Sequence, residues 1–138
     1  MTTTDGEAPR GAASGETAAN DNARDPAVAR AIEAARRDPS RRWTVATLAK
    51  IAGLSRAAFA ARFRADTGAT PLAYVTRLRV DLAASRLVEG SEPLAVVARA
   101  VGYASEFAFA KVFKRVVGVP PGAFRRSRAA PRATRAAA

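Results

Sequence analysis

One pattern of small and aromatic residues occurs twice in the chain, and it constrains the fold more than any other feature. The first copy reads LAKIAGLSRAAFAARFRADTGATPLAY and the second reads VARAVGYASEFAFAKVFKRVVGVPPGAF. Each copy combines a short apolar helix, a glycine turn, a serine cap and a helix with two phenylalanines four residues apart, which is the pattern of a helix-turn-helix. The offset in residue number between matched positions of the two copies is one residue larger after the glycine turn than before it, so the turn of the second copy is one residue longer. The matched pairs are Ala49 and Ala98, Gly53 and Gly102, Phe59 and Phe109, Phe63 and Phe113, Gly68 and Gly118, and Pro71 and Pro121.

Helix start and stop signals organise the remainder of the ordered chain. Asp25 and Pro26 are an N-cap followed by a proline suited to the first helical position. No stretch shows the alternating pattern of a strand. The predicted fold is therefore all-α, with two homeodomain-like helix-turn-helix subdomains joined by a long helix and about seven helices in all. The predicted domain covers residues 25–126, with helix-turn-helix units at 44–68 and 93–118 and the linker helix at 71–89.

The linker helix sets the expected spacing of the two units. Its apolar side is predicted to consist of Tyr74, Val75, Leu78, Leu82 and Leu87. About 18 residues at a rise of 1.5 Å give a length of roughly 27 Å. Two recognition helices held near one duplex turn apart, about 34 Å, would enter successive major grooves. A single chain would then read two half-sites as a monomer.

The termini differ from the body in composition and charge. Residues 1–24 are small, polar and acidic, and we predict that they are disordered. Residues 1–25 carry a net charge of −3 within a total of +11, so the rest of the chain is more basic than the total indicates. Residues 127–138 are predicted to be a basic disordered tail.

Composition excludes several classes of function. The chain has no cysteine and no histidine, which removes thiol nucleophiles, the usual zinc ligands and the commonest general base. We therefore expect no enzyme activity, no metal and no cofactor. No apolar run approaches the roughly 18 residues of a membrane helix, and no signal peptide is recognisable, so the expected location is the cytoplasm. A net charge of +11 favours a polyanionic partner, nucleic acid first and an anionic membrane surface second.

The chain resembles the AraC/XylS family over about residues 27–126. This resemblance implies a seven-helix activator module in a bacterium that binds promoter DNA at the nucleoid and contacts RNA polymerase. The stretch GYASEFAFAKVFKR is most similar to members with an N-terminal cupin-like effector domain, which this sequence lacks. The chain is then either a stand-alone regulator or a piece of a longer one. The resemblance rests on Ser55, Arg56, Phe59, Phe63, Gly68, Pro71, Tyr74, Arg79, Ala83, Ala98, Val101, Gly102, Tyr103, Ser105, Phe109, Phe113, Lys114, Gly118, Pro120, Pro121 and Arg125.

The first recognition helix offers little hydrogen-bonding capacity to DNA. Arg56 would contact a phosphate or a guanine edge, and Arg64 a phosphate, unless both only form a solvated face. The alanines offer methyl contact, most naturally to a thymine methyl, or else reflect helix propensity alone. These candidate contacts are Ala57, Ala60 and Ala61.

The second recognition helix offers more side chains that could contact DNA. Glu106 would accept from a cytosine amino group or serve as a first-turn carboxylate favoured by the helix dipole. Phe107 would contact thymine methyls if it is exposed, and would otherwise extend the core. The remaining candidates on this helix are Ala110 and three expected phosphate ligands, Lys111, Lys114 and Arg115.

Helix N-termini add candidate phosphate sites through their backbone N–H groups. They begin near Thr44, Ser55, Pro93 and Ser105, of which the two serines are expected to act first as structural caps. Arg79 on the linker helix is expected to be an internal hydrogen-bonding anchor, and Trp43 a core residue.

Three functional hypotheses fit this sequence. The first is a sequence-specific transcription regulator. The second is a non-specific architectural nucleic-acid-binding protein, favoured by the blank first recognition helix and the basic tail. The third is a protein-interaction module without DNA binding, which predicts no salt-dependent affinity for DNA.

Overall fold

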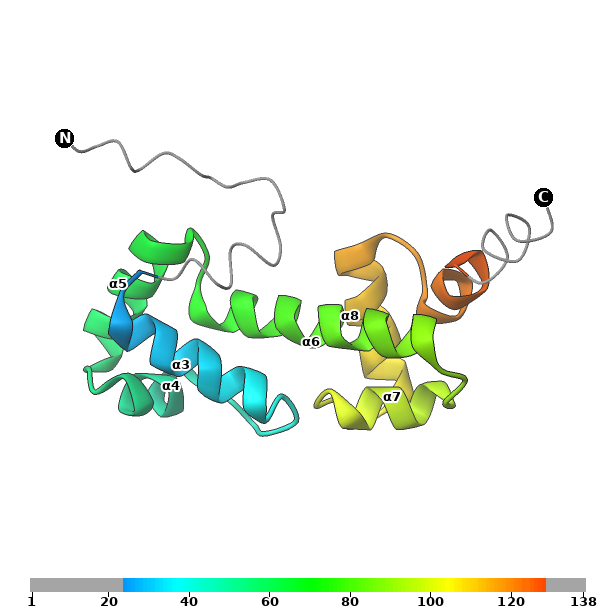
Figure 1. Cartoon of the computed structure of the whole chain (residues 1–138), viewed down its shortest axis with the longest axis horizontal. Helices are drawn as coiled ribbons and strands as arrows, with labels where there is room; N and C mark the ends of the chain where they lie inside the picture. Colours follow the sequence, from blue (N-terminus) through cyan, green and yellow to red (C-terminus); the bar gives the residue numbers. More distant parts are fainter. Residues whose placement is uncertain (1–23, 129–138) are drawn as a thin grey trace. The chain divides into compact units, whose positions relative to one another are not determined.

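The structure, a computed structural model, describes residues 24–128. All regular structure in this range is helical, which confirms the predicted all-α fold (Figure 1). The predicted disordered segment, up to residue 23, and the tail from residue 129 lie outside the described residues. The helices are α3 (Pro26–Arg37), α4 (Val45–Ala52), α5 (Arg56–Thr67), α6 (Pro71–Glu89), α7 (Leu94–Ala100) and α8 (Glu106–Val117), followed by a helical segment at residues 121–128.

The C-terminal helical segment continues beyond the predicted start of the tail. Ser127 and Arg128 are helical, although the sequence places them in the basic tail. The Ser127 hydroxyl donates a hydrogen bond of 3.1 Å to the carbonyl oxygen of Phe124. The Arg128 guanidinium carbon lies 4.9 Å from the centroid of the Phe124 ring. Contacts with a buried aromatic residue therefore extend the helix further than composition indicates.

The described residues form two compact units. The first unit contains α3, α4 and α5, and α3 packs against both other helices. Apolar residues spaced along one face of each helix make its core, as helical periodicity requires. The largest of these buried residues are Val28, Ile32, Leu48, Phe59 and Phe63, and Trp43, just before α4, is buried as well, as predicted.

The second unit contains most of α6, then α7, α8 and the segment 121–128, together with residues 38–42. Its core is built around Phe109 and Phe113, whose ring centroids are 5.6 Å apart. Phe124 packs edge-on against Phe113 at 5.4 Å, and Tyr103 lies 5.9 Å from Phe109. Such offset and edge-on pairs stabilise a core beyond the area that they bury.

Helix α6 buries two different faces, which the sequence did not indicate. Val75 and Leu78 are buried, as predicted, and so is Leu87. At 100° per residue, Leu87 lies on a face about 140° around the helix from the first two. Val80 and Ala83 share that second face and were missed, whereas Tyr74 and Leu82 are only half-buried, so their predicted burial is corrected.

The predicted repeat is present in the local geometry of the two units. Ser55 and Ser105 each accept a hydrogen bond of 3.1 Å from the backbone N–H three residues later. The Phe59–Phe63 centroid distance of 5.5 Å and interplanar angle of 59° nearly equal the values for Phe109 and Phe113. The two recognition helices are thus built alike and differ in what they expose.

Arg79 is the internal anchor that the sequence predicts. Its Nε donates to the carbonyl oxygen of Pro39 at 2.9 Å, and its Nη2 donates to that of Arg41 at 2.8 Å. All three residues belong to the second unit. A single side chain thereby satisfies two carbonyl groups of the loop that follows α3.

Candidate nucleic-acid interface

The outer face of helix α5 consists mostly of alanine side chains. Phe59 and Phe63 are fully or almost fully buried and define its inner side. Successive residues rotate by about 100°, so the residues about 120–180° from this side face outward. Among the candidate contacts, Ala57, Ala61 and Arg64 lie there, and all three are exposed.

Helix α8 presents a basic and aromatic outer face at the same positions. The residues fifty positions further along are Phe107, Lys111 and Lys114, and all three are exposed. Arg115, also about 140° from the aromatic side, is exposed as well. Among residues 24–128, neither lysine forms an ion pair with an acidic side chain, so their charge is available to a polyanion. The repeat therefore presents an apolar surface with one arginine in the first unit and a cationic surface in the second.

Phe107 is not part of the core. Its side chain is 73% exposed, the highest value among the large hydrophobic residues of the described range. The Lys111 ammonium lies 5.5 Å from the centroid of its ring. The structure thus selects the exposed alternative for this residue and rejects the core alternative.

Four other candidates lie on the flanks or ends of the two recognition helices. Ala60 and Ala110 are half-buried, because each is rotated only about 80° from the aromatic side. The expectation that they face outward is corrected to a position at the margin. Arg56 and Glu106 are the first residues of their helices and are exposed there, at the N-terminal ends.

Three of the four candidate helix N-termini have a side-chain cap, whereas Pro93, before α7, provides none. The hydroxyl groups of Ser55 and Ser105 cap α5 and α8, which confirms their structural role. Thr44 forms a capping box with Thr47: the Thr44 hydroxyl accepts from the Thr47 N–H at 3.0 Å, and the Thr44 N–H donates to Thr47 Oγ1 at 2.9 Å. The Thr44 N–H and hydroxyl are thus engaged within the helix end, and a phosphate there would meet the amides that follow. Phosphate binding at these ends remains a prediction.

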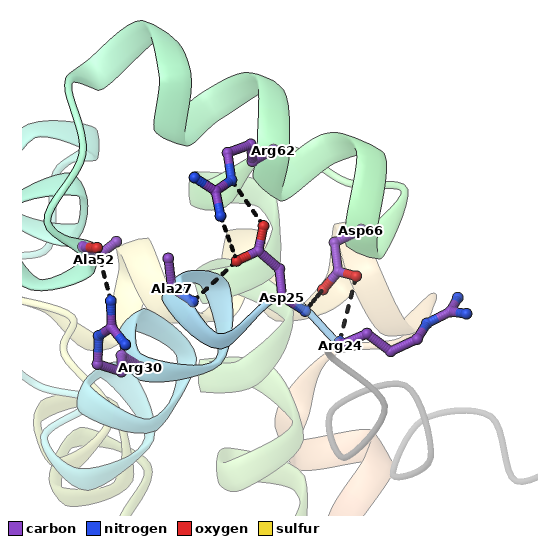
Figure 2. A network of polar contacts seen from close by, with 7 residues as sticks. All are labelled: Arg24, Asp25, Ala27, Arg30, Ala52, Arg62 and Asp66. Carbon is purple, nitrogen blue, oxygen red and sulfur yellow. Dashed lines mark hydrogen bonds and ion pairs between the residues drawn. The ribbon is translucent and has the colours of Figure 1, made fainter.

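Arg62 belongs to a network that holds α5 against the start of α3 (Figure 2). Its Nε and Nη2 donate to the two carboxylate oxygens of Asp25 at 2.8 and 3.0 Å. Asp25 Oδ1 also accepts from the Ala27 N–H at 2.9 Å, so the same carboxylate caps α3. Asp66, one turn further along α5, accepts from the backbone N–H groups of Arg24 and Asp25 at 3.3 and 3.5 Å.

Sequence reasoning missed this network, although one signal for it exists. Arg62 lies about 100° from Ala61 and so points away from the outward face, despite its positive charge. Its Asp25 partner is 37 residues away, and helix phase alone does not identify it. The network fixes the position of α5, the first recognition helix, against the start of α3.

The ion pair predicts a defined acid sensitivity of the first unit. The Arg62 guanidinium lowers the pKa of the Asp25 carboxyl below its ordinary value. A depressed folded-state pKa stabilises the fold above the unfolded-state pKa, and that stability is lost as the pH falls below about 4. We expect Asp25→Asn, which keeps a capping oxygen, to flatten this acid dependence. The fluorescence of Trp43, the single tryptophan, measures the unfolding of this unit against pH.

Asp81→Asn is the matched control for this measurement. Asp81 pairs with Arg77 on α6 at 3.1 Å, with both side chains more exposed than Asp25. Exposed pairs contribute little to stability, so the control should leave the Trp43 curve unchanged. An equal loss of stability with falling pH in Asp25→Asn and in the unaltered chain would contradict the stabilising role of the Asp25–Arg62 pair.

Comparison with known proteins places the chain in a family. A family model described as "Helix-turn-helix domain" matches residues 48–127. A protein of Streptomyces lividans described as a "Putative AraC-like transcription regulator" is 53% identical over 102 residues, which are 74% of this chain and 34% of that protein. The chain belongs to the AraC family. Its predicted resemblance to this family is therefore confirmed.

Other relatives and solved structures agree with this assignment. The AraC-type region is 48% identical over 87 residues to the RCS-specific HTH-type transcriptional activator RclR of Escherichia coli K12, covering 63% of this chain and 31% of RclR. The DNA-binding domain of AdpA, solved in complex with a target DNA, superimposes with a TM-score of 0.73 at 32% identity, covering 76% of this chain and 95% of that domain. An AraC-type regulator from Chromobacterium violaceum, at 23% identity and a TM-score of 0.71, supports the fold alone. The chain spans about a third of the length of the curated relatives that it matches.

Two further observations concern other kinds of site. No helix between residues 24 and 128 combines the length and apolar character needed to cross a membrane. Within the same residues, no group of three or more acidic side chains is placed to hold a metal ion.

Proposed function

We propose that this AraC-type domain is a sequence-specific DNA-binding transcription regulator, not an enzyme, and that it inserts α5 and α8 into successive major grooves of promoter DNA. The observation that carries the proposal is the presence of two locally matching helix-turn-helix units, each with an exposed recognition-helix face. A recognition helix reads base edges with residues near its N-terminus, where Arg56 and Glu106 lie. The AdpA domain, which shares this fold, was solved with a target DNA.

The two recognition helices are proposed to contribute unequally. Ala57 and Ala61 offer only methyl groups, so the first unit would accept varied sequences or prefer A·T steps. Lys111, Lys114 and Arg115 would bind phosphates and hold the second unit in register. Glu106, at the start of α8, would accept from a cytosine amino group, which the methyl groups of the first unit cannot do. The second half-site should therefore contain more of the base preference.

Selection of bound duplexes from random DNA tests the proposal. We expect a two-part site whose halves are separated by about one helical turn of 10–10.5 base pairs, with stronger base preference in the second half. A non-specific architectural binder, the alternative favoured by the bare face of α5, would yield no enriched site. A ratio near one between the affinities for selected and random duplexes, at about 0.15 M salt, would overturn the regulator and support this alternative.

Lys111→Ala should weaken binding to all duplexes and reduce the salt slope of log K by about one unit, since one phosphate contact is lost. The measurement is the dissociation constant of a fluorescent duplex at several salt concentrations. Arg37→Ala removes the same charge from α3, where Arg37 pairs with Glu33 at 3.3 Å, and should leave the slope unchanged. Equal slopes for Lys111→Ala and the unaltered chain would refute the phosphate role.

We propose further that the setting is the bacterial cytoplasm, at the nucleoid, with RNA polymerase as a protein partner. This rests on membership of a family whose curated relatives are described as transcription regulators and activators. A bridging experiment tests the polymerase contact: the chain and polymerase should protect a promoter fragment together more strongly than either does alone.

A further inference from the structure

Phe107 is the feature that the proposed function leaves least explained. A single exposed hydrophobic residue is ordinary on a protein surface and needs no special role. Phe107 differs because of where it lies: it is the second residue of α8, on the outward face, beside Lys111. That is the part of a recognition helix that meets base edges.

The internal repeat provides a comparison for this position. The matching residue of the first unit is Ala57, which is exposed on an equivalent helix with an equivalent serine cap. The fold therefore accepts a methyl group at this position, and the phenyl ring adds nothing to the core of the second unit. Its apolar area is available to a ligand.

The surroundings of the ring favour DNA over a protein partner. Lys111 and Lys114 share the outward face, and the Lys111 ammonium lies 5.5 Å from the ring centroid. The centre of a protein–protein interface is depleted of charged residues, whereas a nucleic-acid interface is strongly positive. The exposed apolar residue Val117 lies ten residues along α8, about 15 Å away, so it does not extend the ring into a patch. A positively charged face with one aromatic ring matches a major groove, which combines negative charge with thymine methyl groups.

We infer that the Phe107 ring reads the C5 methyl group of a thymine in the second half-site. The inference rests on the proposed function and sharpens it: the ring supplies apolar contact that hydrogen-bonding residues cannot supply. A preference for thymine over cytosine follows, because both are pyrimidines and only thymine carries this methyl group. The ring is thus a specificity-determining residue of the second unit.

Replacement of thymine by deoxyuridine tests the inference, since it removes only the methyl group. After selection of a bound duplex, each thymine of the second half-site is replaced in turn, and the dissociation constant is measured by fluorescence anisotropy. We expect one replacement to weaken binding about fourfold, the effect of one buried methyl group. With Phe107→Ala, the same replacement should have no effect.

Two further variants complete the experiment. Phe107→Leu keeps an apolar side chain and should retain part of the methyl dependence. Val117→Ala removes an exposed apolar group from the other end of α8 and should retain all of the methyl dependence.

Three outcomes would overturn the inference alone. The first is an equal loss of affinity on deoxyuridine replacement in Phe107→Ala and in the unaltered chain, and the second is a selected second half-site without thymine. Unchanged affinity of Phe107→Ala for every duplex would overturn it as well and turn attention to a protein partner. A chain that binds no duplex at all would overturn the proposed function together with the inference.

Discussion

Gly102→Val is expected to lower the free energy of unfolding of the second unit by about 4 kcal/mol, through backbone strain and the loss of the two hydrogen bonds that Arg79 donates. Gly102 has a φ of +106°, a conformation that strains a β-branched residue. A Cβ atom there would lie 2.9 Å from both the Arg79 Nε and the carbonyl oxygen of Pro39. The added Cβ would push the Arg79 guanidinium away from the carbonyl oxygens of Pro39 and Arg41, to which it donates hydrogen bonds. Urea unfolding followed by circular dichroism measures the loss.

Gly118→Val is the matched control for this substitution. Gly118 lies in the same unit and has nearly the same φ, +103°, but an added Cβ would meet nothing within 4 Å. Its cost is then the backbone strain alone, about 1–3 kcal/mol. The difference between the two variants isolates the contact with Arg79. Equal losses of stability would contradict the anchor role of Arg79, and an unaltered melting temperature in Gly102→Val would contradict the strain as well.

The repeated units were predictable because their signals are local. A serine cap, a glycine at the end and two phenylalanines four residues apart each act within one or two turns of helix. The caps at Ser55 and Ser105 and the buried aromatic pairs follow directly from such signals. Two copies in register made the assignment stronger than either copy could.

The linker helix was predicted less well for a physical reason. A single stripe is the simplest interpretation of apolar residues in a long helix, but α6 buries different faces in its first and second halves. Val80 and Ala83 therefore lie off the predicted stripe and are nevertheless buried. The burial of Val80, Ala83 and Leu87 depends on a core shared with residues of α7 and α8, and that information is absent from the local sequence.

The candidate interface shows the same division between local and distant information. Helix phase correctly placed Ala61, Arg64, Lys111 and Lys114 on exposed faces. For Phe107, helix phase favoured exposure and hydrophobicity favoured burial, so only the packed structure could decide. The pairing of Arg62 with Asp25 depends on contact between helices distant in sequence, and no local pattern reports it.

Phe109→Ala should lower the free energy of unfolding by about 3–5 kcal/mol, the usual cost of removing a fully buried phenylalanine. Its side chain is 0% exposed, and its ring lies 5.6 Å from that of Phe113 and 5.9 Å from that of Tyr103. Urea unfolding followed by circular dichroism at 222 nm measures this change. A loss below about 1 kcal/mol would contradict the central place of Phe109 in the core.

Phe107→Ala is the same chemical change two residues away, and its expected consequences are the reverse. The Phe107 side chain is 73% exposed, so its removal should alter the free energy of unfolding by no more than about 0.5 kcal/mol. Its effect should appear instead in DNA affinity at one thymine of the second half-site. Because the two substitutions share a helix and a residue type, any difference between them reflects the direction in which each ring points. A comparable loss of stability in both variants would show that Phe107 packs against the fold, and the separation of core and DNA-reading faces on α8 would then be wrong.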